Sequence, residues 1–127
     1  MDIGDAFLLV DKSIDEHLWV VMSDPGANAD EVVIVNLTSH DSPDKDASCI
    51  LDVGDHPWIK HRTSVRYMDA RITKESNLDQ LVRSGALVPK EPASDQMLRK
   101  ILTGAQATQF LPARHRRILE DQNLMDR

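Results

Sequence analysis

The sequence predicts an α+β fold in which a small antiparallel β-barrel is followed by two or three C-terminal helices. Two observations lead to this prediction. Five short segments rich in apolar, β-branched and aromatic residues occur before residue 72, and Gly, Pro and Asp turns separate them. Short strands at this spacing are typical of a small barrel. After Ile72 the apolar residues recur at helical spacing, so strands come first and helices last, which is an α+β pattern.

The five segments are expected to form the strands of the barrel. They are residues 6–10, 17–23, 31–37, 48–51 and 64–68. The second and third are nearly continuous apolar runs, which favours buried strands. The segment Asp24-Pro25-Gly26 predicts a turn, because Pro sets φ at one corner and Gly permits a positive φ after it. A second turn is expected at residues 53–57, where Gly54 and Pro57 occur.

Three helices are expected after the barrel. Ser76 or Asn77 can cap a short helix over residues 78–83, and Gly85 would stop it. Pro89 and Pro92 are expected to break the chain.

Ser94 can cap a second helix, because apolar residues at 97, 98, 101 and 102 follow it at helical spacing. Gly104 is expected to lie beyond the end of that helix. Pro112 precedes a last helix around residues 114–121. Residues 1–72 are therefore assigned to the barrel and residues 73–127 to a helical extension packed on it, within a single domain.

Charge is unevenly distributed along the chain. The formal net charge is −6. Residues 1–72 contain 14 acidic and 6 basic residues, a net charge of −8, whereas residues 73–127 contain 7 and 9, a net charge of +2. The field of the whole molecule therefore repels nucleic acid. A local basic cluster can still act within a Debye length of about 8 Å; its members would be Lys60, His61, Arg62, Arg66 and Arg71.

Composition and motifs exclude several classes of protein. With 41% hydrophobic residues the chain is not disordered. No apolar run approaches the roughly 20 residues of a membrane span, and the acidic start does not resemble a secretory leader. Cys49 is the only cysteine and is expected to be buried. We therefore expect a cytoplasmic protein. There is no Walker loop, dinucleotide fingerprint or paired-Cys motif, so we expect no cofactor and no metal.

Four motifs occur in an order that points to a known family. Gly4-Asp5 precedes the first apolar segment, and the run 17–23 ends in Ser. The run 32–37 leads into Thr38-Ser39, and residues 65–71 hold an Arg, an Asp and then Ala-Arg. Over about residues 4–71, this order resembles the MazF/PemK family of plasmid-maintenance toxins.

The resemblance implies an SH3-like barrel, commonly a homodimer. It also implies metal-free cleavage of single-stranded RNA and inhibition by an antitoxin. Thr38 and Ser39 would contact the scissile phosphate or its neighbours, Arg66 would stabilise phosphate charge, and Asp69 would orient a partner or contact a base. The chain departs from the family where an Arg-Pro pair usually leads into the second strand, because His17-Leu18 stands there.

The residues themselves allow the same chemistry. Metal-free RNA cleavage needs a base for the 2′-hydroxyl, an acid for the leaving oxygen and a cation for the phosphorane. His17, His56 and His61 are candidate proton carriers, and Arg66 is the candidate cation. Catalytic residues are therefore expected at His17, Thr38, Ser39, Arg66 and Asp69. Substrate-binding residues are expected at His56, Trp58, Lys60, His61 and Arg62.

Each of these residues also has a plain structural interpretation. Residues 38–42 can be ordinary turn formers, and His56 can bond to nearby backbone in its turn. Arg66 and Asp69 can be a surface ion pair of little energetic value. Trp19 and Trp58 can serve packing. The basic stretch 114–117 can be a solvated helix face.

Two other functions remain open at this point. One is a non-catalytic SH3-like binding module for a protein or nucleic-acid partner, which the missing Arg-Pro pair and the acidic barrel favour. The other is a degenerate relative in which the helical tail covers the groove and regulates it.

Overall fold

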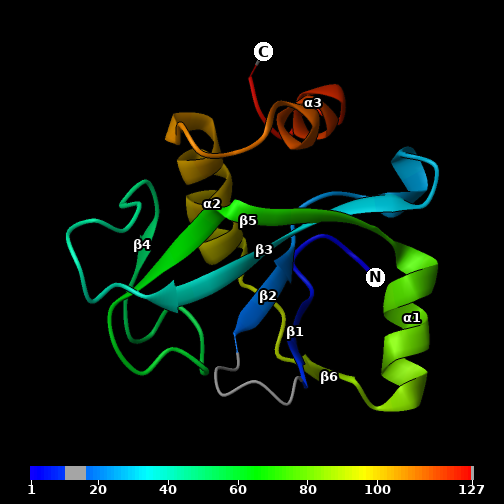
Figure 1. The fold of residues 1–127 in the computed structure, drawn as a ribbon, viewed down its shortest axis with the longest axis horizontal. Helices are drawn as coiled ribbons and strands as arrows, with labels where there is room; N and C mark the ends of the chain where they lie inside the picture. Colours follow the sequence, from blue (N-terminus) through cyan, green and yellow to red (C-terminus); the bar gives the residue numbers. More distant parts are fainter. Residues whose placement is uncertain (11–16, 127) are drawn as a thin grey trace.

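The computed structural model describes residues 1–10 and 17–126, and these fold into one curled antiparallel sheet with helices packed on it (Figure 1). The α+β prediction is therefore confirmed, in the form of a six-stranded half-barrel with three α-helices in the described part of the chain. In chain order the elements are β1 (Ala6–Leu9), β2 (Leu18–Val21), a 3-10 turn (Pro25–Ala27), β3 (Glu31–Ser39), β4 (Ile50–Leu51), β5 (Thr63–Lys74), α1 (Glu75–Ser84), β6 (Leu87–Lys90), α2 (Asp95–Ala107) and α3 (Ala113–Asp121).

The sheet contains one strand that the sequence analysis did not predict. The strand order is β4-β5-β3-β2-β1-β6, and β6 pairs antiparallel with β1 through partners such as Leu9 and Leu87. Pro89 was expected to break the chain, but it lies within β6 opposite Phe7. Proline is tolerated there because β6 is an edge strand, where a missing N–H leaves no ladder bond unmade.

The two faces of the sheet bury different residues. Val33, Val35 and Leu37 of β3 belong to the main core, which α2 and α3 cover, whereas Val32 and Ile34 belong to a second core, which α1 covers. Successive strand residues point to opposite faces, so one strand supplies both cores. Both faces of β2 are covered, and all four of its residues are buried. This confirms the expected buried strand.

The helix ends follow some of the predicted signals. Gly85 ends α1 in the left-handed conformation, with φ of 80°, as expected. The Ser94 side chain accepts a hydrogen bond from Met97 N at the start of α2, as expected. The start of α1 was predicted wrongly, because the helix begins at Glu75 and has no side-chain cap. Its first turn follows directly from β5, which continues well beyond residue 68.

Gly104 lies inside α2 and does not end it, which corrects the sequence prediction. A Cβ atom at this position would lie 2.6 Å from Cys49 Cβ and would also overlap the Tyr67 hydroxyl. The glycine therefore lets α2 approach the sheet closely enough for Tyr67 Oη to donate a hydrogen bond to Ile101 O at 2.6 Å. No helix in residues 1–10 and 17–126 is long and apolar enough to cross a membrane.

The loop between β4 and β5 joins the two edges of the sheet. His56 is buried there, and its Nε2 donates to the carbonyl of Glu91, just after β6. The other ring nitrogen, Nδ1, accepts from Trp58 N at 3.0 Å. Lys100 of α2 adds an ion pair to Asp55 at 2.9 Å. The half-barrel is therefore held curled by side chains and not by a ladder between β4 and β6.

Candidate functional site

Strand register gathers a set of polar residues on the face of the sheet that α1 covers only in part. Trp19 of β2 pairs with Asn36 of β3, which pairs with Arg66 of β5. In the next row Thr38 pairs with Ser64. His17 lies just before β2, and its ring bonds to the backbone of β3 at Leu37. We call this surface the Arg66 face and define it by His17, Asn36, Thr38, Arg66 and Asp69.

A large bulge shapes one side of the Arg66 face. The register between β3 and β5 shifts between Ile34 and Asn36, so that residues 67–70 of β5 stand opposite Val35 alone. Bulges bend a strand and redirect its side chains. Here the bulge brings Asp69 Oδ2 to 3.0 Å from Arg66 Nε, with both side chains about half exposed. The interpretation of these two residues as a surface ion pair is therefore correct.

The ring of His17 is held by the backbone of the neighbouring strand. Its Nδ1 lies 2.9 Å from the carbonyl oxygen of Leu37. A carbonyl oxygen can only accept, so Nδ1 must carry the proton. In the neutral ring the lone pair is then on Nε2, which is the arrangement that a general base needs.

Asn36 is a site residue that the sequence analysis missed. Its side chain is only 5% exposed, and its Oδ1 has no hydrogen-bond partner among the residues that the structure describes. A buried acceptor without a partner costs about 1–3 kcal/mol. The one signal in the sequence is a polar residue within the apolar run of residues 32–37. In the register Asn36 lies between Trp19 of β2 and Arg66 of β5.

A cavity of about 400 Å³ opens beside Arg66. Thr38 and Arg66 line it from the sheet, and Phe110 and residues 44–46 line it from the loops around it. Phe110 and Met68, which also lines the cavity, are 52% and 57% exposed.

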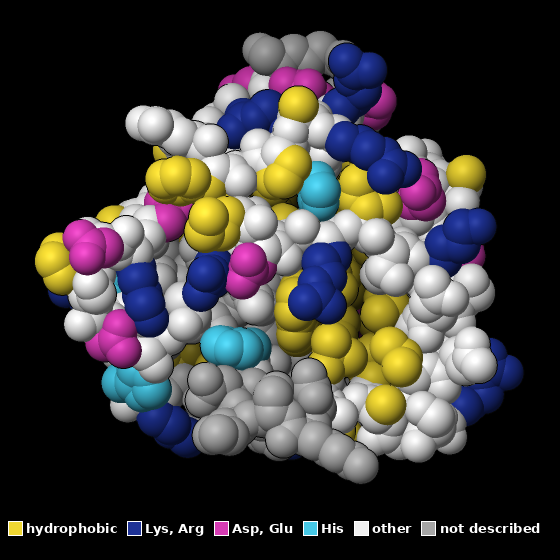
Figure 2. Space-filling model, viewed as in Figure 1, with side chains coloured by type: hydrophobic (Ala, Val, Ile, Leu, Met, Phe, Trp, Pro, Cys, Tyr) yellow, Lys and Arg dark blue, Asp and Glu magenta, His cyan; other side chains and the backbone are white. Residues whose placement is uncertain are grey.

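On the face shown in Figure 2, acidic, basic and hydrophobic side chains are interspersed, without a large area of one charge.

Asp46 fixes the loop that forms one wall of this cavity. Its carboxylate accepts from Thr108 Oγ1 at 2.7 Å and from Ser48 Oγ at 2.6 Å. Burial disfavours the charged carboxylate, but the hydrogen bonds from Ser48 and Thr108 together outweigh it and hold the pKa of Asp46 below its ordinary value. The charged form therefore ties the loop to the end of α2.

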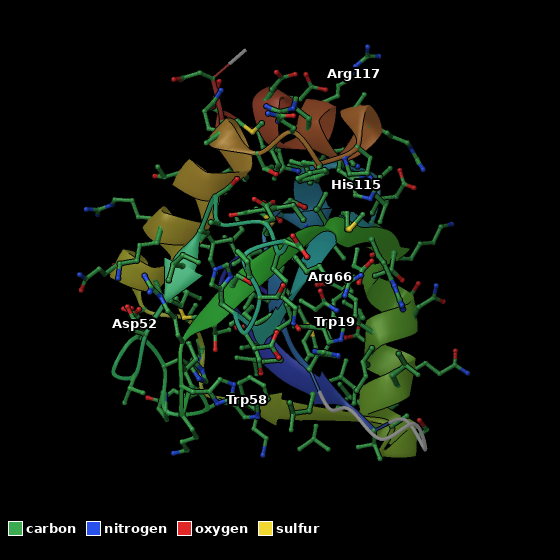
Figure 3. All side chains as sticks on the ribbon, turned by 60° about the vertical axis from the view of Figure 1, so that its left-hand side comes forward. Trp19, Asp52, Trp58, Arg66, His115 and Arg117 are labelled. Atoms are coloured by element: carbon green, nitrogen blue, oxygen red, sulfur yellow. The ribbon has the colours of Figure 1, made fainter. Side chains whose placement is uncertain are left out.

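Trp19 and Arg71 form a stacked pair beside the Arg66 face. The Arg71 guanidinium lies 4.9 Å from the centre of the Trp19 ring, and the indole is buried. Figure 3 shows Trp19 and Arg66 near each other over the middle strands. The packing interpretation of Trp19 is correct, and a cation–π contact holds Arg71 over the ring.

Ser39 lies apart from the other predicted catalytic residues. Its Oγ lies 2.6 Å from His61 Nε2, and Lys45 Nζ donates to its carbonyl at 2.7 Å. His61 lines a second cavity, of about 630 Å³, between the β4–β5 loop and the end of β6. We call it the Trp58 cavity; its lining residues are His56, Pro57, Trp58, Lys60, His61, Thr63, Lys90 and Glu91. It contains four of the five predicted substrate-binding residues, whereas Arg62 lies outside it, 4.0 Å from Asp52.

His56 has a structural role in this loop. Its Nδ1 bonds to nearby backbone at Trp58, as the plain interpretation of the turn expected, and its Nε2 bonds to the distant backbone of Glu91, which was not expected. Burial disfavours a charged Asp55, but bonds from the Asp52 N–H and Lys100 outweigh it and lower the pKa of Asp55. Within the described residues no three His, Cys, Asp or Glu side chains are grouped to hold a metal ion.

Cys49 is unsuited to nucleophilic chemistry. It is buried, and burial raises the pKa of its thiol to about 11. A thiol reacts as its thiolate, which is scarce at neutral pH when the pKa is this high. The prediction of a buried, small apolar residue is therefore confirmed.

Comparisons with protein-family models, with curated proteins and with solved structures gave no match to this chain. The resemblance to the MazF/PemK toxins therefore stays a prediction.

Proposed function

We propose that the chain is a metal-free endoribonuclease of the toxin type, which cleaves single-stranded RNA at the Arg66 face. The observation that carries the proposal is the register of β3 and β5, which puts Thr38 and Arg66 on one face of the sheet, while the His17 ring bonds to the backbone of β3 at Leu37. These side chains are a proton acceptor, a hydroxyl donor and a guanidinium. Metal-free cleavage of RNA requires groups of these kinds close together.

In the proposed reaction the RNA supplies its own nucleophile. His17 Nε2 accepts the proton of the 2′-hydroxyl, and the 2′-oxygen attacks the neighbouring phosphorus. The bond from phosphorus to the 5′-oxygen breaks, and that oxygen takes a proton from water. The products are a 2′,3′-cyclic phosphate and a 5′-hydroxyl end. Arg66 stabilises the charge on the phosphorane, and Thr38 Oγ1 donates to a non-bridging oxygen.

Asp69 positions the guanidinium in this proposal. Its carboxylate holds Arg66 Nε at 3.0 Å, which leaves the two terminal nitrogens of the fork for the phosphate. An exposed ion pair of this kind is worth about 1 kcal/mol or less, so phosphate binding can compete with it.

An SH3-like barrel is part of the same proposal. The support for it is the curled sheet, whose edge strands are joined through His56 and the carbonyl of Glu91. A protein antitoxin and a second copy of the chain are the partners that the resemblance implies.

The direct test is incubation of the purified chain with single-stranded RNA in EDTA, with product ends identified by mass. We expect cyclic-phosphate ends from the parent chain and a loss of about 100-fold in rate for Arg66→Ala. Arg66→Lys keeps the charge without the fork and should recover only part of the rate. Arg117→Ala, which removes an exposed cation on α3, is the matched control and should cleave like the parent.

His17→Asn is the sharpest variant for the base. Its amide nitrogen can take the place of Nδ1 and donate to the Leu37 carbonyl, but it offers no basic nitrogen at the position of Nε2. We expect a folded protein that binds RNA and does not cleave it. Unchanged cleavage would exclude His17 as the base.

A binding module is the second candidate function. It is favoured by the pairing of Arg66 with Asp69 and by the exposed Met68 and Phe110 at the adjacent cavity. RNA binding that Arg66→Ala weakens, without cleavage under any condition, would support this function against the enzyme.

A further inference from the structure

We propose that the Trp58 cavity binds a nucleotide unit, with its base on the Trp58 indole and its phosphate on Lys60 and Lys90. This inference does not depend on cleavage at the Arg66 face, because the two sites lie on different parts of the sheet. The chemical class of the ligand is a 5′-phosphorylated nucleoside, either as a free mononucleotide or within single-stranded RNA.

The size and the aromatic wall of the cavity fit such a ligand. Its volume of about 630 Å³ lies within the range of small-molecule sites, about 300–1,000 Å³. Trp58 is only partly buried, because its indole packs against the main core and also lines the cavity. A partly exposed indole that is held in place is a stacking platform for any base. The His56 Nδ1 bond to Trp58 N at 3.0 Å fixes the backbone that carries it.

The charges at the cavity select an anion in spite of the net charge of −6 on the whole chain. Lys60 and Lys90 are exposed cations that line the cavity from two different elements, one in the β4–β5 loop and the other at the end of β6. Glu91 is the one carboxylate that lines the described cavity, and it opposes them. We assign the phosphate to these two cations.

The pair formed by Ser39 and His61 lies at the rim of this cavity. The Oγ–Nε2 distance of 2.6 Å places the His61 ring against the end of β3. His61 Nε2 is therefore already bonded, while its ring edge lines the cavity. We assign His61 to the wall of the nucleotide site.

The test is a set of titrations of the full chain by calorimetry and tryptophan fluorescence. The probes are uridine 5′-monophosphate, uridine, inorganic phosphate and a short single-stranded uridine oligonucleotide. We expect the mononucleotide and the oligonucleotide to bind, and uridine and phosphate to bind at least about tenfold more weakly.

The variants place the ligand within the cavity. Trp58→Leu keeps apolar packing without the aromatic face and should raise Kd about tenfold. Lys60→Gln and Lys90→Gln should each weaken binding. Each should also reduce the slope of log K against log salt concentration, by about 0.7 for single-stranded RNA. Glu91→Gln should tighten binding. Arg117 lies on α3, far from Trp58 (Figure 3), and Arg117→Gln is therefore the charge-matched control.

Each result decides the proposal. Nucleotide binding that responds to Trp58→Leu and to either lysine change supports it, whether or not the chain cleaves RNA. Binding of phosphate as tightly as the mononucleotide would overturn the base contact. Nucleotide binding that ignores all three changes, or no binding by a chain shown to be folded, would overturn the site. Loss of cleavage in Arg66→Ala with intact nucleotide binding would separate this site from the Arg66 face.

Discussion

Thr38 and Ser39 are neighbours in β3, yet their side chains lie on opposite sides of the sheet. Thr38 lines the cavity beside Arg66, whereas Ser39 Oγ lies 2.6 Å from His61 at the rim of the Trp58 cavity. Successive residues of a strand must point to opposite faces. The Thr-Ser pair therefore cannot act on one phosphate as a unit, but it can link two sites across the end of one strand.

We expect the two hydroxyls to separate in function. Thr38→Val removes the hydroxyl and keeps the shape, and it should slow RNA cleavage by about tenfold because one phosphate donor is lost. Ser39→Ala should leave cleavage within about twofold and instead weaken nucleotide binding by releasing His61. Cleavage rates and mononucleotide Kd values measured on both variants check this. Equal losses of cleavage in the two variants would contradict the division.

His56 is expected to control the closure of the half-barrel. It is 4% exposed and bonded at both ring nitrogens, so His56→Ala leaves two part-buried backbone groups without these partners. We expect a loss of about 2 kcal/mol in the free energy of unfolding in urea, with a change in Trp58 emission. His56→Gln keeps a donor toward the Glu91 carbonyl and should recover part of the loss.

The control for this prediction is Arg62→Gln, an exposed change in the same loop. It should leave the urea midpoint unchanged. If His56→Ala matched this control, the two edges of the sheet would be held together by other contacts.

Much of the fold could be predicted from local patterns. The five apolar segments became strands, and Ser94 and Gly85 acted as the cap and the stop that their types predict. β6 was missed because Pro89 is a breaker by type, and only its place at the sheet edge makes it acceptable. Gly104 was interpreted as a helix end because the reason for a glycine at this position is the close approach of Tyr67 and Cys49, which are distant in sequence.

The candidate site was predictable by residue type but not by arrangement. His17, Thr38 and Arg66 were singled out; strand register brings Thr38 and Arg66 to one face, and a hydrogen bond joins the His17 ring to Leu37 of β3. Asn36 stands out in the sequence only as a polar residue within an apolar run, and the lack of a partner for its Oδ1 is a property of the fold that the sequence does not show. The side of the sheet on which Ser39 lies depends on where β3 ends, and the extension of that strand to residue 39 was not predicted.

Gly104→Ala is expected to destabilise the chain although alanine favours helices. Alanine would gain about 1 kcal/mol in helix propensity, but its Cβ would overlap Cys49 Cβ and the Tyr67 hydroxyl. We expect a net loss of about 1–3 kcal/mol in urea unfolding. Thr103→Ala, an exposed change in the same helix, is the control and should be neutral within about 0.5 kcal/mol.

Tyr67 offers a second check on that contact. Tyr67→Phe removes the hydroxyl bond to Ile101 and should cost about 1 kcal/mol by itself. In the double variant with Gly104→Ala the two losses should sum to less than their separate values, because the phenylalanine ring lacks the atom that the new methyl group meets. If the two losses were strictly additive, the new methyl group at position 104 would not be meeting the Tyr67 hydroxyl.

His115 on α3 is expected to make stability depend on pH near neutrality. Burial lowers the pKa of His115. A hydrogen bond to the Ala70 backbone raises the pKa and the nearby Arg114 lowers it, so that the pKa stays below its ordinary value. Its buried Nδ1 has no partner among the described residues. In the unfolded chain the histidine has its ordinary pKa of about 6.5, so as pH falls the unfolded chain binds a proton at this residue before the folded chain does. The stability due to neutral His115 is present above about pH 6.5 and is lost as pH decreases below it.

Urea midpoints of the parent chain and of His115→Gln, measured from pH 7.5 down to about pH 5, test this dependence. The parent should lose more stability than the variant over this range, because the other histidines are common to both chains and cancel in the difference. Parallel curves would show that α3 tolerates a charged ring at this position. A steeper loss in the variant would reverse the sign of the expected pKa shift and place a proton on His115 in the folded state.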